Sequence, residues 1–457
     1  MGSRQIVFRA CFALTVAALF MAAPTTARAQ LGGVIIKGDT LHTFKTVDPN
    51  LTETRRRLAE ARASLDRDVA SKSKLRFVSL NRLEAVLAKR IENGRGPTET
   101  MKYLAGLTRI KYVFFIPETK DVVIAGPAEG WATLAPGRVV GIHSGRATLE
   151  LQDLVAALRL FRAGTKEGGA VSCSIDPTQE GLAKMQSYMR THRPQENARS
   201  AQRYVDGLKT SLGLHTVSIG GIPADTHAAQ VLVEADYRMK LIGIGVEKPA
   251  VKLRSWVDLA SGGAISRNAM QRWYFVPNYE CVRVSDDGLA MQLVGDGVKL
   301  IGADEVVLKS GQRVKAARVN SASSKFTNGF TKMYPKLADK TPVFAQLRNL
   351  IDLFVAAAFI QNEDYYGKAG WSAKVFGDEK AFPIRTYQTP VHVETAAQAV
   401  WKGRRLLTPV GGGVIVRPRN ALKTSNLLSD EDGRVAAVHE GVDLSKLPKD
   451  KWWWDAK

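Results

Sequence analysis

Apolar residues at three- and four-residue intervals predict two helices within residues 52–96. The residues that form the two stripes are Leu58, Ala61, Leu65, Leu83, Leu87 and Ile91. Ser79 precedes the second stripe and is a suitable N-cap. Because the same segment holds twelve basic residues against six acidic ones, these helices are expected to be strongly basic.

Shorter apolar runs after residue 110 predict strands. Residues 112–116 and 122–125 flank a polar turn in the pattern of a β-hairpin, and residues 139–142 and 147–151 form a second pair around a Ser-Gly turn. An amphipathic helix is expected over residues 152–161.

The middle of the chain alternates strand and helix patterns. A buried-strand pattern at residues 170–175 leads into a helix for which Asp176 is the expected N-cap and Pro177 the first residue. The polar residues 192–200 are the expected linker. A later helix, residues 225–240, has two ion pairs at four-residue spacing that are interpreted as structural. These pairs are Glu234–Arg238 and Asp236–Lys240.

After residue 272 the pattern changes to short strands separated by glycine turns. Five strands are predicted, at residues 273–276, 280–284, 289–294, 298–301 and 305–308. Pairing in chain order would make an antiparallel meander. Two helices follow, at residues 324–334 and 342–361, and Pro335 is expected to end the first of them. Beyond residue 367 short strands return, with a helix at residues 394–401.

These patterns predict the α+β class, with N-terminal helices, mixed α/β segments, an antiparallel meander and a two-helix hairpin. The predicted division of the chain is a signal peptide (1–29), a basic helical segment (30–97), an α/β segment (98–192), a central α+β domain with the meander and the helical hairpin (193–366), a C-terminal α/β segment (367–418) and a polar tail (419–457).

The first 29 residues have the pattern of a secretory signal peptide. Arg4 and Arg9 make a basic start, residues 10–23 are apolar, and Ala27-Arg28-Ala29 supplies the small residues that a signal peptidase reads. The apolar run is shorter than the roughly 20 residues that a membrane-spanning helix needs. The protein is therefore expected to be exported, either periplasmic or secreted, with its mature chain beginning near Gln30 and no transmembrane segment after cleavage.

Charge gives the partner class. The whole chain carries a formal charge of +21, and removal of Arg4, Arg9 and Arg28 with the signal leaves +18. Such a charge favours an anionic partner. In an exported protein that partner is expected to be an envelope polymer or a protein rather than genomic nucleic acid. The alternative is a basic surface that serves solubility alone.

Residues 309–340 have the most uneven charge, with eight basic residues against Asp339. The anion-binding candidates among them are Lys309, Arg313, Lys315, Arg318, Lys325 and Lys332. Phe326, Phe330 and Tyr334 recur at four-residue spacing in the same segment. These rings either stack on a bound partner or fill the core of the protein.

Candidate catalytic residues lie where a strand passes through Gly220-Gly221 into a helix. Asp225 and His227 could act there as an orienting carboxylate and a base, or Asp225 could simply cap the helix and His227 occupy its first turn. Cys173 precedes another helix start, where a thiolate would be stabilised. Its alternative is a core position.

Two cysteines remain in the mature chain, since Cys11 leaves with the signal. Cys173 and Cys281 could form one disulfide in an oxidising compartment, or they could be two separately buried thiols. The spacing of cysteines and histidines contains no zinc pattern, so neither a metal nor a cofactor is expected.

Three consecutive tryptophans, residues 452–454, stand near the C-terminus. Adjacent side chains cannot all share one face of a helix or strand. They could anchor at a membrane interface or stack on a sugar. Alternatively, the tail folds back and covers an apolar patch of its own domain.

Four stretches resemble an exported bacterial family known only as domain of unknown function number fifteen ninety-eight. They are Cys173-Ser174-Ile175-Asp176-Pro177-Thr178, Glu234-Ala235-Asp236-Tyr237-Arg238-Met239-Lys240, Tyr274-Phe275-Val276-Pro277 and Asn349-Leu350-Ile351-Asp352. The similarity is expected to extend over residues 112–418. It implies no reaction, ligand or catalytic residue.

Composition and charge together favour a non-enzymatic binding or scaffolding protein with an anion-attracting basic surface. The alternative hypothesis is an extracytoplasmic hydrolase with its site near Asp225 and His227.

Overall fold

The computed structural model describes residues 32–45, 51–135, 137–166, 169–195, 197–260, 269–307, 313–315, 321–398, 400–402, 405–407, 413–444 and 447–456. The predicted signal peptide, residues 1–29, lies outside these ranges. Mixed sheets and helices make up the structure, which confirms the α+β class.

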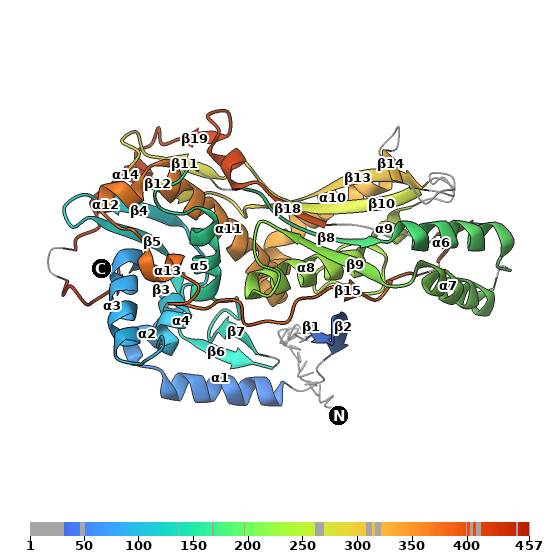
Figure 1. The fold of residues 1–457 in the computed structure, drawn as a ribbon, viewed down its shortest axis with the longest axis horizontal. Coiled ribbons are helices and arrows are strands. Elements are labelled where there is room, and N and C mark those ends of the chain that lie inside the picture. The colour runs from blue at the N-terminus through green and yellow to red at the C-terminus, as the bar shows by residue number, and fades with distance from the viewer. Residues whose placement is uncertain are drawn as a thin grey trace, which may run out of the picture.

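Two sheets lie toward opposite ends of an elongated molecule (Figure 1). The larger sheet has, in spatial order, β1 (Gly32–Lys37), β2 (Thr40–Lys45), β15 (His392–Val393), β9 (His215–Gly220), β8 (Val171–Pro177), β18 (Gly413–Val416), β10 (Ala269–Pro277), β13 (Val298–Val307) and β14 (Arg313–Lys315). The smaller sheet has β19 (Leu427–Ser429), β11 (Val282–Val284), β12 (Ala290–Leu293), β4 (Tyr112–Ile116), β5 (Asp121–Ala128), β3 (Ser73–Ser79) and β20 (Trp453–Asp455). Two separate hairpins pair β6 (Trp131–Leu134) with β7 (Arg138–Gly141), and β16 (Val400–Lys402) with β17 (Arg405–Leu407).

The longer helices cover the sheets and join them. They are α1 (Thr52–Ser64), α3 (Leu80–Glu92), α5 (Leu151–Leu160), α6 (Gln179–Thr191), α7 (Ala198–Leu212), α8 (His227–Gly243), α10 (Ser321–Lys340), α11 (Pro342–Asn362) and α14 (Arg434–Glu440). The short helices are α2 (Arg67–Ala70), α4 (Glu99–Lys102), α9 (Trp256–Leu259), α12 (Tyr365–Ala369) and α13 (Lys374–Gly377), with 3₁₀ turns η1 (Leu104–Gly106) and η2 (Pro418–Leu422).

Helix α11 is the centre of the fold. It packs against α5, α8 and α10, and every residue from Val343 to Ile360 is buried. Its length and hydropathy would also allow it to cross a membrane, and it is the one described helix of which this is true. Because it is fully enclosed by the rest of the chain, it serves here as a core helix.

Several predicted elements are confirmed. The hairpin of β4 and β5, the amphipathic helix α5 and the adjacent long helices α10 and α11 all form where the apolar spacing predicts them. Phe326, Phe330 and Tyr334 are fully buried. Phe330 and Tyr334 pack edge-on against Phe275 and Phe344, and Phe326 packs against Trp273 and Phe330. The core role of these aromatics is therefore the correct interpretation.

The five strands expected after residue 272 appear as four, and these divide between the two sheets instead of forming one meander. β10 pairs with β13, which merges the last two predicted strands, while β11 and β12 form a hairpin in the smaller sheet. Gly295-Asp296-Gly297 is thus a crossing between sheets rather than a hairpin turn. Alternation of apolar residues reports which face of a strand is buried but not which neighbour it pairs with.

Some helix ends differ from the prediction. β8 continues through Asp176 and Pro177, which pair with Thr216 and His215, so α6 begins only after Thr178, whose hydroxyl accepts from the Gly181 amide at 3.0 Å. α10 continues through Pro335 to Lys340. A proline inside a helix costs about 3 kcal/mol, and packing of α10 against β13 and α11 outweighs that cost.

The segments at residues 30–97 and 419–457 contain strands that the pattern did not predict. The segment at residues 30–97 contributes β1, β2 and β3 in addition to helices. Residues 394–398, expected in a helix, have no regular secondary structure, and β16 follows at 400–402. The polar tail contains β19, α14 and β20, and the first and last of these complete the edges of the smaller sheet. The segment boundaries themselves stay a prediction.

Candidate functional site

The first residue of α8, His227, lies in a cluster of buried polar side chains. Thr226 caps the helix by accepting from the Ala229 amide at 3.3 Å. The imidazole Nδ1 lies 3.0 Å from both carboxylate oxygens of Asp153, and Nε2 lies 3.6 Å from Glu150 Oε1. Both acids stand at the start of α5. The ring is therefore held between two carboxylates from one helix end.

The electrostatics of this cluster favour a charged imidazole. Burial lowers the pKa of His227, but Asp153 and Glu150 more than offset that effect and raise the pKa to about 9. Burial raises the pKa of Glu150, an effect that the neighbouring imidazolium opposes. At neutral pH the His227 side chain is a cation that compensates two enclosed acids.

A chain of buried charges continues from this cluster. Arg138, on β7, donates to Gln346 of α11 and to both carboxylate oxygens of Glu234 on α8. Glu234 lies 3.6 Å from Arg238, which in turn donates to Glu247 at 2.7 Å. Arg138 therefore ties the β6–β7 hairpin to the two central helices.

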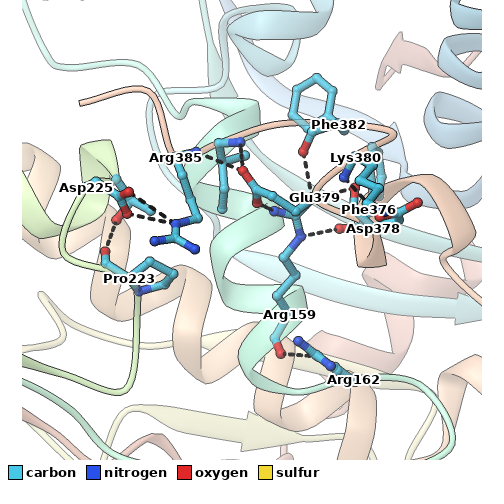
Figure 2. A network of polar contacts seen from close by, with 12 residues as sticks. Arg159, Arg162, Pro223, Asp225, Phe376, Asp378, Glu379, Lys380, Phe382 and Arg385 are labelled. Carbon is cyan, nitrogen blue, oxygen red and sulfur yellow. Dashed lines mark hydrogen bonds and ion pairs between the residues drawn. The ribbon is translucent and has the colours of Figure 1, made fainter. Parts of the chain in front are cut away.

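Asp225 is not the partner of His227. Its carboxylate accepts from Arg385 Nε at 3.0 Å and 3.2 Å, on the outside of the α8 start (Figure 2). The nearby Arg159 forms a separate network with Glu379 and with the backbone carbonyls of residues 376, 378 and 382. The structure does not bring Asp225 and His227 together as an acid–base pair, and Thr226 rather than Asp225 caps the helix.

This placement gives a prediction for Asp225. The Arg385 side chain is 54% exposed and that of Asp225 is 25% exposed, so their ion pair is screened by water. We expect Asp225→Ala to lower the free energy of unfolding by less than about 1 kcal/mol in urea titrations at pH 7. Arg385→Ala is the matched control and should behave alike. A loss above about 2 kcal/mol for either variant would mean that the pair holds the α8 start in place.

The carboxylates that do contact His227 could not be identified from sequence. Asp153 lies 74 residues away along the chain. Glu150 and Asp153 stand three residues apart at a helix start, where acids are common because they interact favourably with the helix dipole. The helix dipole alone accounts for these two acids, so their pattern in the sequence does not indicate the contact with His227.

The two cysteines are separate buried thiols. Cys173, on β8, and Cys281, beside β11, belong to different sheets and neither is bonded to the other. Burial raises the pKa of the Cys173 thiol well above its usual value, and burial raises the pKa of Cys281 to about 12. Both thiols are protonated at neutral pH, so a nucleophilic role for Cys173 has no support in this geometry.

The acids and bases predicted to pair along α8 are buried. Lys240 donates to Asp236 at 2.9 Å and to the carbonyl of Ile175 at 3.0 Å, so it connects α8 to β8. Burial raises the pKa of Asp236 to about 6, while burial lowers the pKa of nearby His215 to about 3. In the motif that ends at Asp352, that carboxylate is also buried and accepts from Arg109 at 2.8 Å. These residues hold the interior together.

The basic segment 309–340 is described in part. Lys309 and Arg318 lie outside the described residues, and Arg313 and Lys315 fall on β14. Lys325 and Lys332 are exposed on α10, as are Lys336 and Lys340. Within the described ranges, no cluster of His, Cys, Asp and Glu side chains has a geometry that could hold a metal ion.

Comparisons with known proteins give one match. No curated protein and no solved structure matches the chain. Residues 173–256, from β8 to the start of α9, match the sequence model of a family described as protein of unknown function DUF1598. The matched segment contains two of the four stretches that carry the resemblance, and it is shorter than the expected range of residues 112–418. The resemblance to this family, which has no assigned function, is therefore confirmed over residues 173–256.

Proposed function

We propose that the protein is exported and that it is a non-enzymatic binding or scaffolding protein whose basic surface holds an anionic polymer or protein of the cell envelope. The signal-peptide pattern supports export. The charge of +18 on the mature sequence supports an anionic partner. The observation that carries the proposal is the position of the lysines on α10.

Four exposed lysines form one stripe along α10. Lys325, Lys332, Lys336 and Lys340 follow each other at intervals of seven, four and four residues, which places them on one side of a helix. The stripe is about 22 Å long. Asp339, the acid of this helix, pairs with Arg146 at 2.7 Å, so its charge is directed to another partner. Such a row of cations suits an extended polyanion.

The hydrolase alternative has less support. It required Asp225 and His227 to act together, and the hydrogen-bond and ion-pair partners of His227 among the described residues are two carboxylates and the Gln346 amide, with the ring of Tyr387 5.6 Å from the imidazole. None of these three groups is a nucleophile that an imidazole could activate.

A salt series tests the electrostatic proposal. For the chain beginning at Gln30, the logarithm of the affinity for poly-glutamate should fall linearly with the logarithm of salt concentration. A variant in which the four stripe lysines become glutamine should have a slope smaller by about 2–4, because fewer counterions are released when it binds. The substitutions are Lys325→Gln, Lys332→Gln, Lys336→Gln and Lys340→Gln. An affinity of the unmodified protein for poly-glutamate that does not change with salt concentration would contradict the proposal.

A further inference from the structure

Helices α6 and α7 form an arm that extends beyond the end of the larger sheet (Figure 1). The two helices pack on each other, and Leu182, Leu212 and Met185 form a small apolar cluster that is separate from the main core. The arm thus has its own packing seam. Its tip, defined here as residues 188–204 and described apart from residue 196, is far from the interior that the core stabilises.

The tip is rich in exposed arginine. Arg190 lies in the last turn of α6, Arg193 lies in the connecting loop, and Arg199 and Arg203 lie one turn apart on α7. In the described part of the chain, no carboxylate forms an ion pair with any of these four guanidinium groups. The tip sequence contains one acid, Glu196, against four arginines. Arginine presents a planar fork of donors that matches the two oxygens of a carboxylate or phosphate.

An aromatic stack lies among these arginines. The ring of His192 stacks on Tyr188 with centroids 4.1 Å apart and planes 16° apart, and Tyr188 also contacts Tyr204 at 5.4 Å. The stack has a built support. A Cβ on Gly207 would lie 2.1 Å from the Tyr188 hydroxyl, so a larger residue there would displace this ring from α7.

The stack gives the tip a flat surface for a ligand. His192 is exposed, and with Tyr188 covering one side of its ring, the other side is available to solvent. An exposed ring face flanked by arginines suits a ligand that presents an apolar ring face together with acidic groups.

We propose that the arm tip binds an acidic polysaccharide, with Arg190, Arg193, Arg199 and Arg203 on its carboxylate or phosphate groups and His192 against a sugar ring. This inference rests on the proposed function, because the predicted export of the protein favours a sugar polymer over a single-stranded nucleic acid. It goes further by assigning the partner class and a site that is distinct from the α10 stripe.

The test compares two variants that lose the same charge. In the arm variant the four tip arginines become glutamine, and in the α10 variant Lys325, Lys332, Lys336 and Lys340 become glutamine. The probe is a short oligogalacturonate, measured by calorimetry with the chain beginning at Gln30 at physiological salt. We expect the arm variant to bind at least about tenfold more weakly and the α10 variant to stay within about twofold of the unmodified protein.

A second comparison tests the sugar assignment. His192→Ala should weaken oligogalacturonate binding about fivefold or more and leave binding of poly-glutamate unchanged, since the polypeptide has the charge but no sugar ring. Circular dichroism of each variant checks that the helix content of the whole chain is unchanged, and His192→Phe, which keeps a flat ring, should restore binding.

The outcomes separate this inference from the proposed function. Equal losses in the arm and α10 variants, or no loss in the arm variant, would overturn the arm site while the salt dependence of the unmodified protein still supported an anionic partner. Tighter binding of a single-stranded oligonucleotide than of oligogalacturonate would overturn the sugar assignment. A flat salt series with poly-glutamate contradicts the proposed function by itself.

Discussion

Replacing His227 with alanine is expected to lower the free energy of unfolding by about 3–5 kcal/mol at pH 7, which is the usual cost of removing one partner from a buried ion pair. The side chains of His227, Glu150 and Asp153 are 13%, 12% and 8% exposed. Without the imidazolium, two carboxylates at the start of α5 would face each other in the interior with little water. Urea denaturation of the variant and the unmodified chain measures the difference.

A triple variant provides the control for this interpretation. If the loss comes from unpaired acids, adding Glu150→Gln and Asp153→Asn to His227→Ala should recover part of the stability, because neutral amides are cheaper to bury than charges. If the triple variant were less stable than the single one, the loss would instead come from packing around the ring.

The same cluster gives the stability of the protein a defined pH dependence. The pKa of His227 is raised from 6.5 in the unfolded chain to about 9 in the folded protein. The folded state therefore holds this proton more tightly, and its contribution is complete below pH 6.5 and lost as the pH rises to 9. We expect the unmodified protein to lose about 3 kcal/mol over that window and His227→Ala to lose much less. Equal pH profiles for the two chains would show that the ring is neutral when folded.

Deletion of residues 451–457 is expected to have an effect at least as large. Trp452 is 7% exposed within the core, Trp454 stacks on Phe77 at 5.3 Å, and β20 pairs with β3 along the edge of the smaller sheet. Burial of two tryptophans alone suggests a loss of about 4–6 kcal/mol. Thermal and urea unfolding of the shortened chain check this value.

The tail also neutralises a buried charge, that of Arg76. Its side chain is fully buried, and it donates to Asp455 from Nε at 2.7 Å and from Nη2 at 2.9 Å. Trp453 covers the same guanidinium at 4.6 Å. Asp455→Asn should therefore cost about 2–3 kcal/mol without removing the strand. Unchanged stability after deletion would contradict the folded-back tail and favour the alternative of an exposed membrane or sugar anchor.

The tail shows where local sequence patterns stop being informative. Trp453 and Trp454 point to opposite sides of β20, and Trp452 directly precedes this strand. Each lies in a different environment: the core for Trp452, two cations for Trp453 and Phe77 for Trp454. The sequence allowed both an anchor and a covering strand. Only the edge of β3, almost four hundred residues earlier, distinguishes them, because it offers unpaired backbone groups and an apolar ring.

The candidate site follows the same rule. The pattern around Gly220-Gly221 predicted a helix start at which His227 stands, and that position is correct. The pattern could not show that His227 turns toward Asp153 while Asp225 turns toward Arg385. Residues two positions apart at a helix start point in different directions, so each contacts a different part of the tertiary structure.

The sequence by itself determined the α+β class, the helices α5 and α11, the β4–β5 hairpin and the basic character of the chain, since each depends on spacing or composition within a short window. The tertiary structure decided which strands share a sheet, why α10 tolerates Pro335, which acids neutralise His227, and how the tryptophans are covered. These outcomes depend on segments that are distant in the chain. Periodicity within a short window indicates which face of an element is apolar. Which residues pack against that face depends on the free energy of the whole fold.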